Sequence, residues 1–514
     1  MTQLYRGRIA PEFQAKALKA LDEYRGEKAA LEQRITENNI WYQARYKKPS
    51  SGRQETEAST AFIFNAIENK YAEAVDNYPG LNISERLPDD ERTARLLSQI
   101  LPVQLELSHF KRCYKTCWRR KLKHGTAVYG VFYNEDIGDI EIRSVDLLNV
   151  YCDMHVENVQ ESPFLFITSV CDNRELREDY PAFRELFQGD AQVKTYSGTH
   201  TAPDKTEIVD CYYKKRENGK SILHMMKFAG GTLLDATEDR PEFSGGLYAH
   251  GKYPVVFDVL YPQEDGPFGF GMVDILKNPQ LYIDKLDSVI CKNAVIAGKI
   301  RYMVKDNGGI NEREILDYSN DIIHVAGSVD DSNIRQLQAN ALDEFVITHR
   351  QNKILELKEI IGNRDFQQGG TFGGVTAAAA ITTLQQTGEK MSRAMVDDSY
   401  DCYKELVAMM IELIREFYTD EKIYRLTDEH GQKEFKVFSA NMMFHGDNRP
   451  AEFDVEIIPK RENPMTREAN NQMILSMWQN GLLLPQNVGT AMPVLEALQF
   501  DGKEKLLGQL VSGQ

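Results

Sequence analysis

The chain has 514 residues, 42% of them hydrophobic, which is enough to bury a large core divided among two or more domains. Its formal net charge of −16 excludes a tight, non-specific nucleic-acid binder, because such a protein needs a basic surface to displace phosphate counterions, although DNA could still pass with weak contacts. The sequence has no apolar run long enough for a membrane span and no apolar signal-peptide core, and its seven cysteines are scattered, so we expect a protein made in the cytoplasm with reduced thiols.

The N-terminal third begins with predicted helices and continues as a mixed region. Residues 11–38 are strongly charged and helix-compatible, 60–77 form an amphipathic pattern, and a third helix is predicted from Pro88 through a basic end to Gly125. After Gly125 the period changes from helical to alternating, which predicts strands around a short helix at 173–187. The strands are expected at 126–134, 139–145, 164–170, 207–214, 221–228 and 255–260.

A compact insert between two long helices is predicted next. The first helix is expected to have Asn278 as its N-cap and Pro279 at its first position. One face of it carries Tyr282, Leu286, Val289, Ile290, Ala294 and Ala297. The second helix, 341–361, ends where Gly362 can serve as a C-terminal cap. We therefore expect an antiparallel helical pair that carries the insert, 299–338, at its tip. Within the insert we expect a strand at 300–304, a small helix at 311–318 and a second strand at 321–325.

The stretch 363–374, NRDFQQGGTFGG, cannot form regular structure because four glycines fall within six residues. A helical pattern resumes with Thr376 as N-cap and continues to Tyr418 without a proline. Such a helix would be roughly 60 to 65 Å long, which exceeds the needs of an ordinary compact domain. The remaining elements are strands at 422–426, 435–444 and 453–458 and helices at 465–478 and 492–510.

A zinc site is conceivable in the third predicted helix. His109, Cys113 and Cys117 share one helical face, and His124 follows two turns later. The paired CxxC spacing of structural zinc sites is absent, and a thiol pair that faces the core is the alternative. The sequence contains no phosphate-binding loop, nucleophile elbow or metalloprotease helix. We therefore predict no enzymatic activity, no cofactor and no bound metal.

The same helix carries a run of basic residues. It could contact phosphate groups, or it could compensate the helix dipole and pair with the acidic neighbours that are plentiful here. In an acidic chain, salt bridges between subunits are a stronger candidate than DNA contact. The run comprises Lys111, Arg112, Lys115, Arg119, Arg120, Lys121 and Lys123.

The order of these elements resembles the portal proteins, the head-to-tail connectors of tailed bacteriophages. Several soft motifs are also portal-like: residues 38–46, FNAIE at 64–68, GTAVYGVFYNED from Gly125, and GGVTAAAAITTLQQTGEKMSR after the glycine-rich stretch. The resemblance covers about residues 38–460 and implies an α+β, mainly helical subunit. In such a subunit the wing would consist of 1–266 and 375–460, including the long helix 375–418. The two-helix stem would be 271–298 and 341–361, and the small α/β clip would be 299–338. The tunnel loop would be 363–374, and a short helical crown would follow at 461–514.

The resemblance implies a homo-oligomeric ring, typically of about twelve subunits, at one capsid vertex. Double-stranded DNA would pass through it with weak, non-sequence-specific contacts, driven in by the large terminase subunit and later ejected. Other implied partners are the head-completion or connector proteins, the tail proteins, and the major capsid and scaffolding proteins. The implied location is the virion, after synthesis in the host bacterial cytoplasm and without a membrane association.

Two groups of site residues follow from the resemblance. The tunnel loop would face DNA with Arg364, Phe366, Gln367, Gln368, Thr371 and Phe372. The clip would dock terminase and connector proteins through Lys305, Asn311, Glu312, Arg313 and Glu314.

The main alternative function is a helical scaffold or adaptor of a phage particle that does not contact DNA. A zinc-dependent enzyme that uses His109, Cys113 and Cys117 is a third possibility. Ring-shaped particles in negative-stain images would favour the portal interpretation over both.

Overall fold

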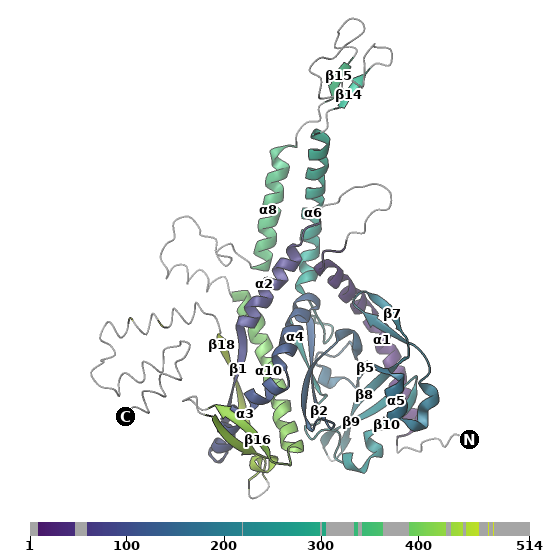
Figure 1. Ribbon diagram of the computed structural model, residues 1–514, viewed down its shortest axis with the longest axis vertical. Helices are drawn as coiled ribbons and strands as arrows, with labels where there is room; N and C mark the ends of the chain where they lie inside the picture. The colour runs from purple at the N-terminus through teal and green to yellow at the C-terminus, as the bar shows by residue number, and fades with distance from the viewer. Residues whose placement is uncertain are drawn as a thin grey trace.

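The computed structural model of the chain describes residues 9–46, 59–217, 219–298, 301–304, 334–337, 342–362, 390–427, 433–445 and 449–461, together with positions 471 and 476. A body of mixed helices and antiparallel sheets carries one projecting pair of long helices, α6 and α8 (Figure 1). The predicted α+β class is therefore confirmed. No helix in the described ranges is long and apolar enough to cross a membrane.

The first two predicted helices form, and an unpredicted strand follows them. Helix α1 spans Pro11–Tyr42, four residues beyond its predicted end, and α2 spans Phe62–Asp76. Strand β1, Asn77–Glu85, then pairs antiparallel with β18, Phe453–Arg461, near the other end of the described chain. The sequence pattern missed β1 because Pro79 and Gly80 indicate a helix stop, whereas the strand is stabilised by a partner far away in the sequence.

The single helix predicted from Pro88 to Gly125 is wrong, because the structure has two helices there. Helix α3 ends at Leu107 (Glu91–Leu107) and α4 begins at Phe110 (Phe110–His124). Between them His109 has a left-handed φ of 53°, and the Ser108 hydroxyl donates to the carbonyls of Gln104 and Ile140. The break lets α3 pack on β1 while α4 packs on α2 and β2, so the apolar period alone could not reveal it.

The two larger sheets are antiparallel and have three and five strands. The first has the order β11-β2-β3, and the second has the order β10-β9-β8-β5-β4, with α1 packed on one face of it (Figure 1). Strands β2 and β3 have the predicted bounds. The three strands of the first sheet are Thr126–Asn134, Asp139–Val145 and Val255–Val259. The five strands of the second, in chain order, are Val150–Cys152, Phe164–Asp172, Lys205–Glu217, Lys220–Ala229 and Thr232–Ala236.

The short predicted helix at 173–187 is only partly helical, because α5 spans Asn173–Asp179 and a 3-10 segment follows at Pro181–Leu186. Two small hairpins lie beside the large sheets. They consist of β6 and β7, Ala191–Thr195 and Gly198–Ala202, and of β12 and β13, Tyr261–Pro262 and Gly269–Phe270.

Helix α10, Lys390–Phe417, lies in the main core of the body, where it contacts α2, β2, β11 and β18. Its predicted start at Thr376 lies outside the described residues. After α10, β16 and β17 (Lys422–Thr427 and Lys433–Phe438) form a hairpin. Strand β17 is shorter than predicted because a 3-10 turn follows it at Ala440–Met443. The helices predicted at 465–478 and 492–510 fall almost entirely on residues outside the described ranges.

Helix α6 spans Met272–Ala297 and begins earlier than predicted. Its N-cap is Gly271, whose backbone N–H donates to the Asp274 carboxylate over 2.9 Å, so Pro279 lies inside the helix. Gly271 and Gly125 both lie where α4 meets the start of α6. Gly125 has φ +88°, and a Cβ there would lie 2.3 Å from the carbonyl carbon of Phe270. This junction therefore requires a residue without a side chain at position 125.

Candidate functional site: the α6–α8 pair and the start of α10

The predicted site residues themselves lie outside the described ranges. These are Arg364, Phe366, Gln367, Gln368, Thr371 and Phe372, and Lys305, Asn311, Glu312, Arg313 and Glu314. The structure instead defines the elements on either side of them. Helix α8 spans Glu344–Ile361 and ends at Gly362, which has a left-handed φ of 72° as a C-terminal cap. Helix α10 is described from Lys390 onward.

Helices α6 and α8 are joined by an ion pair and an aromatic contact. The Arg350 guanidinium donates twice to the Asp287 carboxylate, with Nη2 3.1 Å from Oδ2. The pairing with Asp287 raises the pKa of Arg350 further. Nearby, the Tyr282 hydroxyl lies 3.4 Å from Nε2 of His349. A bidentate pair holds both planar groups in one orientation, so it sets the register of the two antiparallel helices.

The distal end of the pair leads into a two-stranded antiparallel sheet. Strand β14, Arg301–Val304, follows α6, and β15, Ile334–Leu337, precedes α8. The predicted strand at 300–304 is confirmed, and β15 was not predicted. The predicted helix at 311–318 and strand at 321–325 lie outside the described residues. The pair thus carries a small β structure at the end remote from the body (Figure 1).

The body end of α6 is held by a buried polar network. Asp284 accepts hydrogen bonds from the backbone N–H and the hydroxyl of Thr60, at 3.0 and 2.7 Å, and from the Tyr46 hydroxyl. Burial of Asp284 raises its pKa to about 6. Gln280 accepts from the Ile63 N–H over 2.9 Å and donates to the Thr60 carbonyl over 2.7 Å. These bonds attach the projecting helix to the start of α2.

The start of α10 is anchored by two buried lysines. Lys121 Nζ, from α4, lies 2.6 Å from Asp258 Oδ1 on β11, 2.6 Å from Ser399 Oγ and 3.3 Å from the Met395 carbonyl on α10. Lys70 Nζ, from α2, donates to Ser392 Oγ over 2.7 Å. The first turns of the long helix, which follow residues 363–389, therefore have a fixed position on the body.

The sequence analysis did not identify this anchor. Its only local signals are a lysine on the buried face of α4, four residues after Cys117, and an aspartate inside the apolar strand VVFDV. Each signal indicates a buried charge that needs a partner. Neither one tells which distant residue supplies it.

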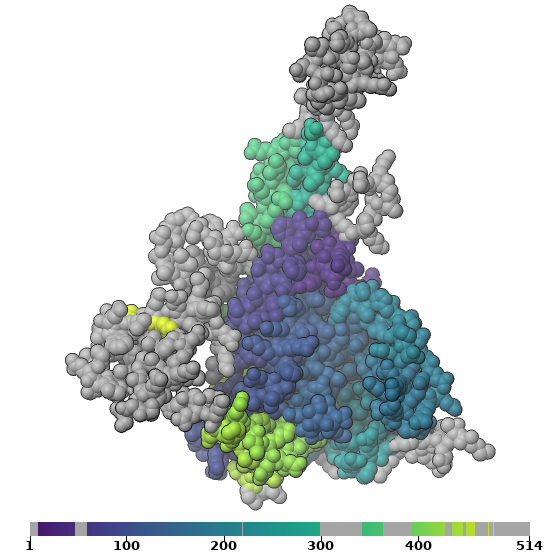
Figure 2. All heavy atoms as spheres, in the orientation of Figure 1, coloured from purple at the N-terminus to yellow at the C-terminus, as the bar shows by residue number. Residues whose placement is uncertain are grey.

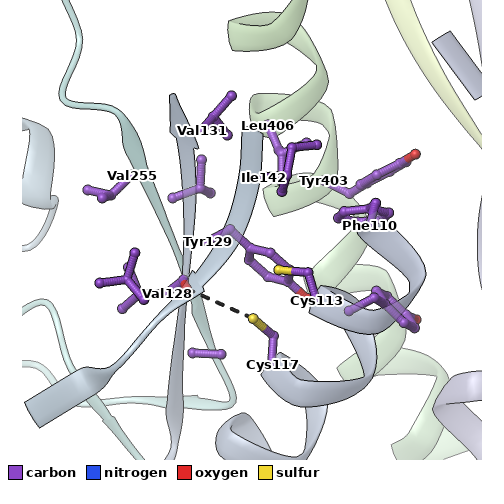
Figure 3. Close-up of a cluster of buried hydrophobic side chains, with 14 of the residues drawn as sticks. Phe110, Cys113, Cys117, Val128, Tyr129, Val131, Ile142, Val255, Tyr403 and Leu406 are labelled. Carbon is purple, nitrogen blue, oxygen red and sulfur yellow. Dashed lines mark hydrogen bonds between the residues drawn. The ribbon is translucent and has the colours of Figure 1, made fainter. Parts of the chain in front are cut away.

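The thiols considered as zinc ligands lie in the hydrophobic core. Cys113 and Cys117 pack among Phe110, Tyr129 and neighbouring apolar side chains, and the Cys117 thiol faces the Val128 carbonyl (Figure 3). The Cys117 thiol and burial together raise the pKa of Cys113, which disfavours the thiolate that zinc requires. His109 caps the helix and does not share its face. Within the described ranges no three His, Cys, Asp or Glu side chains form a metal-binding group.

Three residues of the basic run on α4 form ion pairs inside the chain. Arg119 pairs with Glu68, Arg120 with Asp146 and Lys121 with Asp258, at 3.1, 3.1 and 2.6 Å. Burial lowers the pKa of Lys123 to about 8. The prediction that the run pairs with acidic neighbours is therefore confirmed for these three residues, and salt bridges with another subunit stay a prediction. The physical reason is that α2, β11 and the segment after β3 supply acidic side chains within reach of α4.

Comparison with known proteins gives one family match, to the C-terminal part of the chain. No curated protein matches it. Residues 271–509, from the cap of α6 onward, match the model of the phage P22-like portal protein family. This match supports the predicted resemblance of the chain to the portal proteins of tailed bacteriophages.

Proposed function

We propose that the chain assembles into a ring at one vertex of the phage capsid, with about twelve copies around a channel for double-stranded DNA. The observation that carries this proposal is the projecting α6–α8 pair with β14–β15 at its far end, followed in sequence by the anchored helix α10, all within residues 271–509 that match the portal family. The rival function, a scaffold or adaptor that does not contact DNA, has no such observation in its favour.

In this proposal the parts of the subunit have the following roles. The α6–α8 pair is the stem, within 271–298 and 341–361, and 299–338 is the clip. Residues 363–374 are the tunnel loop, and α10 is the described part of the long helix 375–418. The body, 1–266 and 375–460, is the wing, and 461–514 is the crown.

The charge of the chain suits a channel for a polyanion. A net charge of −16 keeps the ring from holding phosphate groups by counterion release, so DNA can slide through. The contacts are left to the tunnel loop, whose polar residues Arg364, Gln367, Gln368 and Thr371 meet DNA while Phe366 and Phe372 pack as wedges. Ring symmetry repeats each weak contact in every copy.

The chain itself hydrolyses nothing in this proposal. The large terminase subunit supplies the ATP-driven movement and docks on the clip, through Lys305, Asn311, Glu312, Arg313 and Glu314. Connector and tail proteins later occupy the same end, and the major capsid and scaffolding proteins surround the ring during assembly.

Native mass spectrometry and negative-stain imaging of the purified chain test the ring. We expect closed rings of one copy number over a range of salt and protein concentrations. Monomers or dimers under all conditions would contradict the proposal.

Deletion of residues 367–372 tests the tunnel loop. We expect rings to assemble normally, while DNA packaging or retention falls in an infection assay. The control replaces the exposed turn residues Asp136 and Ile137, between β2 and β3, by glycine and should affect neither readout. Normal packaging and retention by the loop deletion would show that the loop is not a working DNA contact.

Charge reversal in the clip tests terminase docking. We expect Glu312→Lys with Arg313→Glu to weaken terminase binding to assembled rings. The control reverses Glu91 and Arg95, an exposed ion pair on α3 with 3.1 Å between its charged atoms. Equal terminase binding by the clip variant and the control would remove this docking site from the proposal.

A further inference from the structure

Helix α6 has a line of exposed apolar side chains along its length. Ile275, Tyr282, Val289 and Ile296 recur every seven residues and are 38%, 46%, 51% and 44% exposed. Seven residues make nearly two helical turns, so the four side chains form one ridge. The residues that α6 buries, such as Ile283, lie on a different face. The described residues leave these four side chains partly exposed, and the upper part of the α6–α8 pair rises clear of the coloured body (Figure 2).

Helix α8 also has an outer face with large apolar side chains. Phe345 and Leu355 are 70% and 53% exposed, and they lie on the side away from the buried Leu357 and Ile361. Phe345 stacks on His349 with 5.7 Å between the ring centroids, yet most of its side chain stays exposed. A group of large exposed apolar side chains is typical of an interaction surface.

The contacts between the two helices place the ridge and the outer face at matching heights along the pair. Asp287 is level with Arg350 because their side chains pair directly. Counting five residues along each antiparallel helix from this pair brings Tyr282 level with Leu355. Counting five residues in the other direction brings Phe345 level with Lys292, between Val289 and Ile296 on the ridge.

The charges beside these apolar residues are opposite on the two helices. The exposed side chains Lys285 and Lys292 lie along the ridge of α6. The outer face of α8 carries the exposed side chains Glu344 and Glu359. Each face thus complements the other in both charge and apolar content, and neither complements a copy of itself.

We propose that the α6 ridge of one copy packs against the outer face of α8 in the next copy, with Leu355 at Tyr282 and Phe345 between Val289 and Ile296. This inference rests on the proposed ring, with the stems standing along its axis. Rotation about the axis leaves the height of each residue unchanged, so level residues on the two faces meet. The contact joins two different surfaces, and such a heterologous contact closes into a ring when repeated.

Cysteine cross-linking in the full-length chain tests the pairing. The variant combines Tyr282→Cys and Leu355→Cys with Cys291→Ser, which removes an exposed native thiol. Mild oxidation of assembled rings is expected to give a ladder of covalent multimers on a denaturing gel. The control combines Tyr282→Cys with Phe345→Cys on the same face of α8. Phe345 lies ten residues along α8 from Leu355, so it is about 15 Å away from Tyr282 in height. A disulfide requires Cα atoms within about 7 Å, so no ladder is expected.

Val289→Glu gives a second test that does not depend on oxidation. Because Val289 is half exposed in the single subunit, the variant should unfold at the wild-type temperature. The protein concentration needed for half-assembly should rise at least about tenfold, because an apolar side chain is no longer buried between copies.

The outcomes separate the two proposals. Two results together would overturn the α6–α8 contact and leave the ring intact. After oxidation, rings of the Tyr282 and Leu355 cysteine variant would give only monomer on the denaturing gel, and the Val289→Glu variant would assemble into rings as well as the wild type. Absence of rings from the wild-type chain under every condition would overturn the ring itself, and this contact with it.

Discussion

Replacement of Asp258 by alanine tests whether the buried lysine anchor holds α10 on the body. The side chains of Lys121 and Asp258 are 0% and 1% exposed, so the substitution leaves an ammonium group in the core with Ser399, the Met395 carbonyl and the Trp118 ring as its remaining contacts. Breaking a buried ion pair by removing one partner typically costs about 3–5 kcal/mol, which corresponds to a fall of roughly 5 °C in melting temperature for a body of this size.

Differential scanning calorimetry measures this loss, and hydrogen exchange locates it. We expect faster exchange in the first turns of α10, because they lose their attachment to α4 and β11. The double variant Lys121→Met with Asp258→Leu removes both charges and should recover most of the stability. As a control, Glu23→Gln breaks the exposed pair with Lys19 and should cost less than about 1 kcal/mol. A cost for Asp258→Ala as small as that of the control would refute the reasoning.

Three further predictions concern the junctions of the projecting pair. Gly125→Ala should destabilise the chain clearly more than Gly138→Ala in calorimetry: both residues have positive φ, a strain of about 1–2 kcal/mol, but only at position 125 would a Cβ strike the backbone of β13. The pKa of Asp284 is raised above its ordinary value of 3.8 to about 6, so its contribution to stability is full below pH 3.8 and is lost as pH rises through about 6. The melting temperature of the wild type relative to Asp284→Asn should therefore fall between pH about 4 and pH about 7, and a constant difference would show that this carboxyl does not titrate there. Arg350→Ala should increase hydrogen exchange in α8 and lower the free energy of unfolding by less than about 2 kcal/mol. The cost is small because the arginine side chain is 31% exposed and its loss leaves Asp287 partly solvated. Unchanged exchange would mean that the pair does not hold the helices together.

Elements governed by local pattern were predicted well. Strands β2 and β3 have the predicted bounds, because alternating apolar residues and a turn between them specify a hairpin within one short segment. The cap at Gly362 was likewise predicted from the residue alone, because glycine accepts the left-handed conformation that ends α8. The family could be predicted too, since it depends on the order of helices and strands along the chain.

Predictions failed where a distant partner decides the structure. Nothing near Ser108 and His109 marks the break between α3 and α4, which arises because the two helices pack on different neighbours. The pattern at Asn278 and Pro279 indicated a helix start, yet the Gly271 cap and the packing of α6 on α2 and α4 place the proline inside the helix.

The sequence by itself predicted the main helices and several of the strands, showed that the chain is acidic, and predicted an order of elements that resembles a portal protein. Only the tertiary structure decided which face of each helix is covered. Tyr282 and Val289 belong to an apolar face of α6 that the fold leaves exposed, while Asp284 and Asp287 on the same helix are buried. The period of a helix shows that an apolar face exists, but burial depends on what packs against it. For α6 the described residues of the body and of α8 cover the polar network and leave the apolar ridge partly exposed.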